Sequence, residues 1–226
     1  MTTVFIISAP SGSGKSTLVN EIRQRVPKLE FSVSYTTRKA RGSERDGCEY
    51  SFISREQFRD MIAKDEFLEY AEVFSEDYYG TARRFLRKAE ELGNDLLLDI
   101  DVQGAEQIRR KIPDAISIFI LPPNREELER RLRQRGQNPE AVIQRRLETA
   151  GHEIENYREY DYILVNDRLE DSVKALEAIL LSERYKRQGK GDAGLSTIAE
   201  KYRLENVRQR LQPILQSFGK TVASVK

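Results

Sequence analysis

Four short stretches of the chain are predominantly apolar, and each ends at a turn or at polar residues. They are residues 4–7, 96–100, 116–121 and 162–165. An apolar run without alternating polar positions is typical of a strand buried on both faces, as in a parallel sheet between layers of helices. Between these runs, apolar residues at helical spacing predict helices over residues 15–25, 83–92, 103–111, 125–135, 140–158 and 169–185. The alternation predicts an α/β fold, with a mostly parallel sheet flanked by helices.

Residues 33–82 break this alternation. The apolar runs in and beside this segment are short and predict strands over residues 31–35, 49–53 and 67–74. A helix is expected to begin after Ser54, because Gln57 follows three positions later in a capping-box pattern. We interpret residues 33–82 as a small α+β region inserted into the main domain.

The C-terminal part of the chain changes character again. Residues 187–194 are rich in glycine and charge and predict a linker, and a helical tail follows that Pro213 should disturb. Whether this tail packs on the domain or joins copies of the chain into a homo-oligomer stays open. The expected organisation is a domain over residues 1–186 (core 1–32 and 83–186, insertion 33–82, helical lid about 125–150), followed by a linker and helical extension over 187–226.

Composition argues against several classes of function. The net charge is +1, so no global excess of positive charge points to nucleic acid or to an anionic membrane. One cysteine, Cys48, precludes an intrachain disulfide, and with one histidine, His152, a His/Cys metal site is not expected. The opening apolar run is too short for a signal peptide, and no stretch approaches the ~20 apolar residues of a membrane span. These features fit a cytoplasmic enzyme that acts on small molecules.

Residues 9–16, between the first strand and the first helix, read Ala-Pro-Ser-Gly-Ser-Gly-Lys-Ser. The stretch matches the P-loop pattern G-x-x-x-x-G-K-[ST] except that Ala9 replaces the first glycine. Its glycines let backbone N–H groups turn toward a phosphate, Lys15 supplies charge, and Ser16 offers a hydroxyl ligand to Mg²⁺. We interpret it as the ATP site of a P-loop NTPase fold rather than a simple glycine-rich turn. The residues assigned to ATP are Ala9, Pro10, Ser11, Gly12, Ser13, Gly14, Lys15, Ser16 and Thr17.

Polar residues in and beside the insertion indicate a second, anionic substrate. They are Ser34, Arg38, Arg41, Tyr50, Glu69, Tyr79, Thr81 and Asp101. Arginine forks and tyrosine hydroxyls suit a phosphate monoester. A carboxylate beside hydroxyls suits a nucleobase edge, and guanine offers two adjacent donors, N1–H and the N2 amine, to one carboxylate.

Separated motifs, in one order along the chain, resemble the guanylate kinase family over roughly residues 3–186. They are Phe31-Ser-Val-Ser-Tyr-Thr-Thr-Arg38, Arg41, Glu49-Tyr50-Ser-Phe52, Glu66-Phe-Leu-Glu69, Tyr79-Gly-Thr81 and Asp99-Ile-Asp-Val-Gln-Gly104. The resemblance implies that guanine is held by Ser34, Glu69, Thr81 and Asp101. It implies that the GMP phosphate is held by Arg38, Arg41, Tyr50 and Tyr79, and that Asp99 lies near Mg²⁺. The chain departs from the family pattern at Ser75-Glu76-Asp77, one residue longer than usual, and beside Arg41 at Ala40, Gly42 and Ser43.

Three arginines, Arg131, Arg135 and Arg146, lie on the two helices of the expected lid. Arginines brought to one pocket from two helices can stabilise the charge of a phosphoryl group in transfer. The alternative is a charged, solvated helix surface, as we expect for the neighbouring Arg130. The resemblance implies that Arg135 and Arg146 contact phosphates and that Arg131 and Asn166 lie toward the adenine.

Together these features predict a guanylate kinase that uses ATP and Mg²⁺ to phosphorylate GMP, and by expectation dGMP, in purine metabolism. The expected catalytic residues are Lys15, Arg38, Arg135 and Arg146, and the expected metal site is Ser16 with Asp99. Three alternatives stay open. One is a kinase for another nucleoside monophosphate, and one is a nucleic-acid binder. The third is a non-catalytic guanylate-kinase-like protein-binding module, against which the intact Gly14-Lys15-Ser16 speaks.

Overall fold

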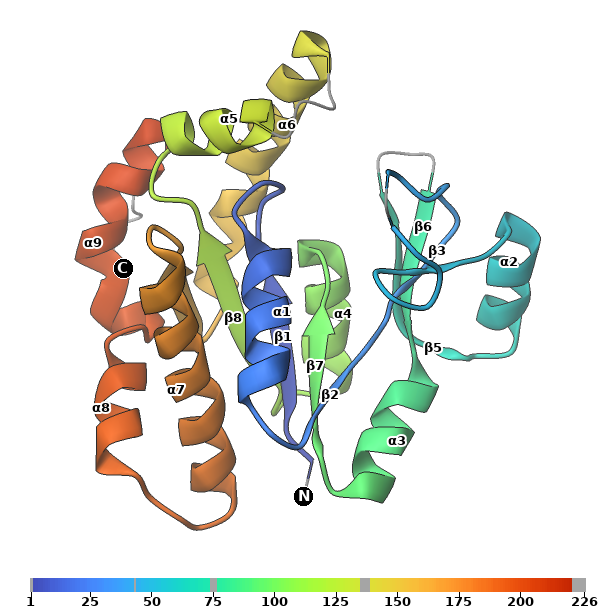
Figure 1. Ribbon diagram of the computed structural model, residues 1–226, viewed down its shortest axis with the longest axis horizontal. Coiled ribbons are helices and arrows are strands. Elements are labelled where there is room, and N and C mark those ends of the chain that lie inside the picture. The colour runs from blue at the N-terminus through green and yellow to red at the C-terminus, as the bar shows by residue number, and fades with distance from the viewer. Residues whose placement is uncertain (1, 43, 74–76, 135–138, 221–226) are drawn as a thin grey trace. The chain divides into compact units, whose positions relative to one another are not determined.

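The computed structural model describes residues 2–42, 44–73, 77–134 and 139–220 (Figure 1). Its strands are β1 (Val4–Ser8), β2 (Leu29–Phe31), β3 (Tyr35–Thr36), β4 (Ser51–Phe52), β5 (Phe67–Val73), β6 (Asp77–Ala82), β7 (Asp95–Asp99), β8 (Ile116–Leu121) and β9 (Tyr162–Val165). Its helices are α1 (Lys15–Arg25), α2 (Arg55–Ala63), α3 (Arg83–Leu92), α4 (Val102–Lys111), α5 (Arg125–Gln134), α6 (Glu140–Ile154), α7 (Leu169–Arg187), α8 (Ala193–Glu200) and α9 (Leu204–Ser217), with a 3-10 turn, η1 (Glu155–Glu159).

The larger sheet has five strands in the order β2-β7-β1-β8-β9. The pairings of β2 with β7 and of β8 with β9 are parallel, with Leu29 opposite Asp95 and Ile118 opposite Tyr162. Every residue of β1 is buried, as is nearly all of β8. Burial on both faces explains the predominantly apolar runs, and the predicted α/β class is confirmed.

The chain divides into two compact units. The first unit comprises Met1–Ile6 and Pro27–Ala115, and the second comprises Ile7–Val26 and Ile116–Lys226. The residues predicted to bind the second substrate all fall in the first unit. Those predicted to bind ATP all fall in the second.

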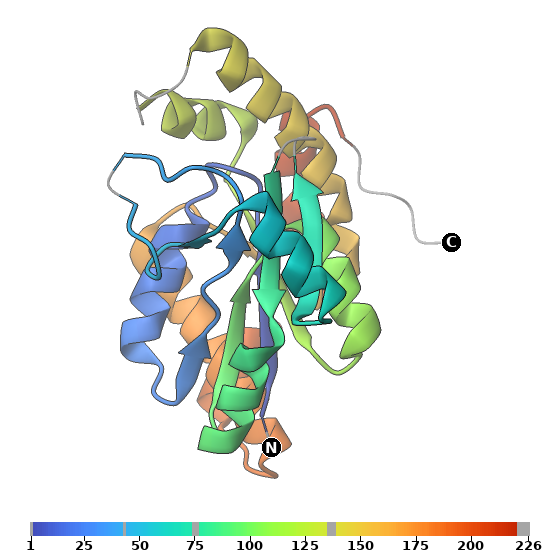
Figure 2. The ribbon, with the colours of Figure 1, turned by 90° about the vertical axis from the view of Figure 1, so that its right-hand side faces the viewer.

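The first unit also carries a four-stranded sheet in the order β4-β3-β6-β5. α2 lies beside this sheet (Figure 2), and the ring of its Phe58 stacks on Phe67 and Tyr78 at centroid distances of 4.4 and 5.3 Å. Ser54 begins α2 with the predicted capping box, because its hydroxyl accepts the N–H of Gln57 and the Gln57 side chain accepts the N–H of Ser54. The inserted region therefore has a small core of its own.

In the second unit the C-terminal helices pack on the neighbouring strands and helices. The N–H of Ile163 in β9 donates to the Tyr202 carbonyl at 2.8 Å. Arg203 donates to the buried Glu183 carboxylate of α7 at 2.8 Å. Phe218 packs against an apolar cluster shared by α5 and α6. Within the second unit, the extension is thus held by backbone, ionic and apolar contacts.

The prediction of one strand over residues 31–35 is wrong, because two strands of different sheets occupy this stretch. β2 ends at Phe31, and the next N–H, that of Ser32, still donates to the Leu97 carbonyl of β7 at 3.1 Å. The Ser34 carbonyl instead accepts the N–H of Ser51 at 2.9 Å, which begins the pairing of β3 with β4. β6 was not predicted, since its tyrosines and Gly80 show no clear alternation.

Some helix limits also differ from the predictions. α6 ends at Ile154, and the predicted helical residues after it form the 3-10 turn. α9 continues through Pro213, contrary to the expected disturbance. Proline removes one helical N–H, but burial of Leu211, Ile214 and Leu215 offsets that loss. Of the predicted linker, Ala193 and Gly194 belong to α8.

Candidate functional site

The phosphate loop, residues 9–16, connects β1 to α1. Gly12 and Gly14 have φ angles of 98° and 87°, in the region that glycine adopts most readily. Ala9 is not among the residues with positive φ, so the alanine in place of the first glycine introduces no backbone strain. α1 begins at once with Lys15. A glycine-rich turn leading directly into a helix N-terminus is the arrangement of an anion site.

Both glycines also allow close packing within the second unit. A Cβ on Gly12 would lie 2.9 Å from methyl carbons of Leu128 and Leu132 of α5. A Cβ on Gly14 would lie 2.3 Å from Nδ2 of Asn166. A side chain at either position would therefore push α5 or Asn166 away from the loop.

Asn166 and Arg131 converge on the Ser13 carbonyl of the phosphate loop. Asn166 Nδ2 donates to it at 2.7 Å and Arg131 Nη1 at 3.4 Å. Arg131 also donates from Nη2 to the Asn166 carbonyl at 3.0 Å and from Nε to Glu127 at 2.7 Å. The structure thus brings both residues to the loop, where they hold its backbone.

The remaining loop residues differ in exposure. Ser11, Ser16 and Thr17 are exposed, Lys15 is half-buried, and Pro10 and Ser13 are buried. The Ser13 hydroxyl has no hydrogen-bond partner within the ranges that the structure describes. Ser16 and Thr17 thus lie on the surface in the first turn of α1.

The predicted lid arginines lie on α5 and α6 or beside them. Arg146 is half-buried on α6, whereas Arg135 lies outside the described residues. The two helices are joined by a cluster of buried side chains, Leu128, Leu132, Ile143, Leu147 and Ala150. The two helices of the predicted lid therefore pack against each other.

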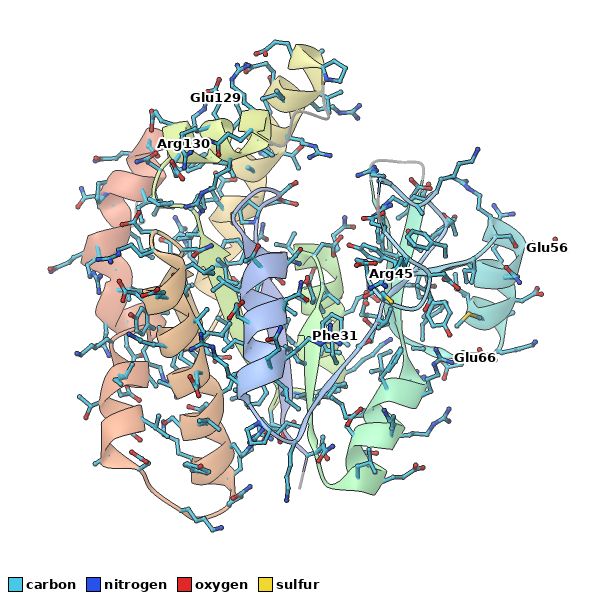
Figure 3. The ribbon with its side chains drawn as sticks, viewed as in Figure 1. Phe31, Arg45, Glu56, Glu66, Glu129 and Arg130 are labelled. Atoms are coloured by element: carbon cyan, nitrogen blue, oxygen red, sulfur yellow. The ribbon has the colours of Figure 1, made fainter. Side chains whose placement is uncertain are left out.

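Other arginines of α5 form ion pairs on its surface, as expected for Arg130. Figure 3 shows Arg130 and Glu129 on this helix, and Arg130 donates to Glu127 at 2.6 and 2.7 Å. Arg133 bridges Glu129 and Glu140, with contacts of 2.7 and 2.5 Å. These exposed pairs contribute little to stability individually, and they join α5 to the start of α6.

Arg38 is the buried centre of the insertion site, which comprises Ser34, Arg38, Arg41, Tyr50, Glu69, Tyr79, Thr81 and Asp101. Its side chain donates from Nε to the Tyr79 hydroxyl at 3.1 Å, and from both terminal nitrogens to the Glu44 carboxylate at 2.7 and 2.8 Å. Its guanidinium carbon lies 4.8 Å from the ring centroid of Tyr50. Hydrogen bonds to Glu44 raise the pKa of Arg38 above its usual value, and hydrogen bonds from Arg38 lower the pKa of Glu44.

The other predicted phosphate ligands surround Arg38. The rings of Tyr50 and Tyr79 meet edge to face with centroids 5.8 Å apart. Arg41 is exposed, and its backbone N–H donates to Glu44 Oε2 at 2.8 Å. The structure thus brings Arg38 and the two tyrosines into contact, and Glu44 joins Arg41 to them.

Glu69 is a buried carboxylate on β5, directly opposite Thr81 of β6. Burial raises the pKa of Glu69 to about 7 and the charge of Asp101 adds to the rise, whereas Thr81 and Lys111 oppose it. The Thr81 hydroxyl is buried and has no aligned hydrogen-bond partner in the described part of the chain. A ligand that offers both donors and acceptors would satisfy these two groups.

The last predicted residues of this unit lie at ends of elements. Asp101 begins α4, and its carboxylate accepts the N–H of Gly104 at 2.8 Å. Asp99 is half-buried at the end of β7. Ser34 is buried where the chain passes between the two sheets. Of the predicted base-binding residues, the structure brings Glu69, Thr81 and Asp101 together.

Sequence reasoning missed Glu44. It lies in a loop of charged residues, where a carboxylate is ordinarily solvated, and only its spacing from Arg38 and Arg41 could have suggested a partner. The fold of the loop brings the Glu44 carboxylate within hydrogen-bonding distance of the Arg38 side chain and the Arg41 backbone N–H.

The described residues hold neither a cluster of metal-ligating side chains nor a helix that could span a membrane. Among the described residues, no group of three or more His, Cys, Asp or Glu side chains is arranged to hold a metal ion. No helix in the same ranges is long and apolar enough to cross a membrane.

Comparison with known sequences identifies the family. The guanylate kinase family profile matches residues 1–183. A guanylate kinase of Koribacter versatilis is 57% identical over 224 residues, covering 96% of this chain and 95% of the relative. A guanylate kinase of Vibrio vulnificus is 50% identical over 187 residues, covering 82% of this chain and 90% of the relative. The first match extends into the C-terminal extension, so that segment is not peculiar to this chain.

A solved structure has the same fold. The crystal structure of guanylate kinase from Anaplasma phagocytophilum superimposes with a TM-score of 0.68 at 35% identity. The match covers 80% of this chain and 86% of that one.

Proposed function

The chain belongs to the guanylate kinase family, and we propose that its two sites bind ATP and GMP for phosphoryl transfer between them. The enzyme phosphorylates GMP to GDP at the expense of ATP, in purine nucleotide metabolism. A GMP phosphate oxygen attacks the γ-phosphorus, the bond to the β,γ-bridging oxygen breaks, and ADP leaves. The observation that carries the acceptor assignment is the buried Glu69 carboxylate beside the Thr81 hydroxyl, in the same unit as Arg38 and its tyrosines.

ATP is held by the phosphate loop. Backbone N–H groups of the loop and of the first turn of α1 bind the phosphates, and Lys15 adds a positive charge at the β- and γ-phosphates. Asn166 and Arg131 fix the loop through the Ser13 carbonyl and lie toward the adenine. The ATP-binding residues are Ala9, Pro10, Ser11, Gly12, Ser13, Gly14, Lys15, Ser16, Thr17, Arg131 and Asn166.

The phosphate of GMP is held by Arg38, Arg41, Tyr50 and Tyr79. The Glu44 carboxylate accepts a hydrogen bond from each terminal nitrogen of Arg38, and Nε of Arg38 donates to the Tyr79 hydroxyl. The phosphate therefore binds on the tyrosine side of the guanidinium, where one N–H of Nη2 and the hydroxyls can donate to it.

Guanine is held by Ser34, Glu69, Thr81 and Asp101. The carboxylate of Glu69 accepts from N1–H and the N2 amine, and the buried hydroxyl of Thr81 completes the base edge. Adenine cannot offer both donors at these positions, so AMP would leave a buried carboxylate unpaired. GMP and dGMP share the base and are both expected as acceptors.

Mg²⁺ fits this chain as an ion that arrives with ATP. Its preferred ligands are oxygens, the described part of the chain offers no carboxylate cluster for it, and Ser16 exposes a hydroxyl at the start of α1. Ser16 would ligate the ion and Asp99 would hold its water ligands. The ion would neutralise charge that develops on the phosphates during transfer.

The residues that act on the transferred group are Lys15, Arg38, Arg135 and Arg146. ATP and GMP are both polyanions and must approach each other. The positive charges of these four residues offset the repulsion between the two substrates. Arg146 comes from the packed lid helices, and Arg135 from the segment after α5. An enzyme of this kind acts in the cytoplasm, and self-association through the C-terminal extension is a further expectation that light scattering would check.

An acceptor panel tests the proposal. The wild-type chain is assayed with ATP and Mg²⁺ against GMP, dGMP, AMP and dTMP, with ADP release coupled to NADH oxidation. We expect turnover with GMP and dGMP only. Equal turnover with AMP would contradict the guanine assignment, and a failure to bind ATP would favour the non-catalytic binding module instead.

A further inference from the structure

One face of α4 contacts the edge of β5 on both sides of Glu69. β5 is the last strand of its sheet, so only β6 pairs with it there, and its outer backbone groups need other partners. Gln107 supplies two of them: its Oε1 accepts the N–H of Tyr70 at 3.3 Å, and its Nε2 donates to the Tyr70 carbonyl at 2.7 Å. Lys111 Nζ donates to the Leu68 carbonyl at 2.6 Å.

These contacts leave Glu69 between two fixed neighbours. Leu68 and Tyr70 turn their backbone groups toward α4, and Glu69 itself pairs in register with Thr81 of β6. The side-chain amide of Gln107 therefore acts as a neighbouring strand would. The backbone of Glu69 is held from the helix side and from the strand side together.

Gly104 lies on the same helix face, one turn before Gln107, and directly faces the Glu69 carboxylate. A Cβ at Gly104 would lie 2.6 Å from Oε2 of Glu69 and 3.4 Å from Oδ1 of Asp101. Glycine weakens a helix relative to alanine, and Gly104 does not have a positive φ that would require it. Space for the carboxylates is the physical reason that the structure offers for this residue.

We propose that α4 sets the acceptor specificity of the enzyme: Gln107 and Lys111 position β5 through its backbone, and the absence of a side chain at Gly104 leaves the space in which the Glu69 carboxylate lies. The proposal rests on the proposed function, in which Glu69 accepts from guanine. Gln107, Lys111 and Gly104 are positioning residues, since they act through Glu69.

The test compares GMP with IMP, which keeps N1–H but lacks the N2 amine. The ratio of kcat/KM for the two acceptors reports how strongly the Glu69 carboxylate interacts with the N2 amine of guanine. We expect Gly104→Ala to lower kcat/KM for GMP by about tenfold to hundredfold and to bring the GMP-to-IMP ratio toward one, with the KM for ATP unchanged. Gln107→Glu can still accept from Tyr70 N–H but cannot donate to its carbonyl, and a smaller loss of about fivefold is expected.

The matched control is Gly151→Ala. Gly151 is also a buried glycine within a helix, α6, and beyond its two chain neighbours and the local helix backbone no atom lies within 4 Å of a Cβ built on it. It should retain both kcat/KM values. Thermal melting of each variant checks the fold, and alanine in a helix should not lower the midpoint by itself.

The outcomes separate the two proposals. If Glu69→Gln loses the GMP preference but Gly104→Ala and Gln107→Glu behave like Gly151→Ala, the inference about α4 is overturned and the function stands. If the wild-type chain does not phosphorylate GMP in preference to IMP, the proposed function is overturned, and this inference with it.

Discussion

In the proposed function, the phosphate loop and the insertion site bind anions by different means. The loop is one continuous stretch, and its glycines and the start of α1 direct backbone N–H groups at a phosphate. The insertion site uses side chains drawn from residues 34–101, and it buries charge: Arg38 is 8% exposed and Glu69 is 3% exposed.

This difference has an energetic consequence. Backbone N–H groups carry no net charge, so directing them at an anion needs little desolvation. A buried charge without a partner costs much more. Arg38 has the Glu44 carboxylate as its partner, whereas the pKa of Glu69 rises to about 7 because its burial is only partly compensated. In the proposed function the loop therefore binds phosphate groups through its backbone, and the insertion site recognises its substrate with buried charged side chains, at a cost in stability.

The largest expected effect is that of Lys15→Ala in the phosphate loop. Lys15 provides the one side-chain positive charge of residues 9–17, and removing it should lower kcat by about 10³-fold. The fold should persist, because the side chain is only half-buried at the start of α1. A coupled assay at saturating GMP with circular dichroism melting measures both. Lys64→Ala, an exposed lysine after α2, is the control; near-normal turnover of Lys15→Ala would contradict the loop's role.

Glu69→Gln should have the next largest effect, and it should fall on the acceptors that carry guanine and not on ATP. The amide cannot accept from both guanine donors, so the KM for GMP should rise by about 10²-fold while the KM for ATP is unchanged. Because the pKa of Glu69 is about 7, the wild-type KM for GMP should also rise as the pH falls below 7, and the variant should lack this dependence. Steady-state kinetics between pH 6 and 8, in ~0.5-unit steps, measure it. The exposed Glu66 is changed to Gln as the control, and an equal loss with all acceptors would argue against base recognition.

Glu44→Gln should raise the KM for GMP by about fivefold to tenfold, because Arg38 loses a charged, bidentate partner that orients it. Kinetics with GMP as the varied substrate measure it. Glu49→Gln is the matched control, since Glu49 also accepts a backbone N–H, that of Arg45, in the same loop. A lower KM in Glu44→Gln would mean that Glu44 competes with the phosphate instead of positioning Arg38.

The remaining expected effect is on stability, and its size depends on pH. The folded-state pKa of Glu69, about 7, lies above the ordinary value of 4.5, so the folded state binds this proton more tightly than the unfolded state does. The stabilising contribution is complete below pH 4.5 and is lost as the pH rises through 7. Glu69→Gln should therefore be more stable than the wild type at pH 8 by at most about 3 kcal/mol, with a smaller difference at pH 5. Urea unfolding at both values measures it, and an equal difference at both would contradict a raised pKa.

The parts of the fold that follow from local chemistry were predicted well. The limits of α1, α3 and β8 agree with the apolar spacing and the flanking glycines and prolines. The phosphate loop was found from eight consecutive residues, because its function depends on a backbone path that those residues largely determine. The errors lie where the limits of a strand depend on its pairing partners. Residues 31–35 are the example, because β2 and β3 belong to different sheets.

The insertion site shows the same limit at the level of side chains. The arginines, tyrosines and glutamate of the insertion site indicate a phosphate and a base. Their order along the chain does not show which side chains they hydrogen-bond to in the fold. Glu44 lies on Arg38, and α4 holds β5 beside Glu69, only because the loop and the small sheet bring them together.

The sequence alone determined that this protein has a parallel α/β core, a P-loop and the residue types of a guanylate kinase, since periodicity and contiguous motifs are local properties of the chain. The tertiary structure decided which charges are buried, which are paired and which carboxylate titrates near pH 7. Desolvation and hydrogen bonding depend on neighbours that are distant in the chain. Gly104 is the clearest case, because a Cβ at this position would collide with the Glu69 carboxylate, 35 residues away in the chain.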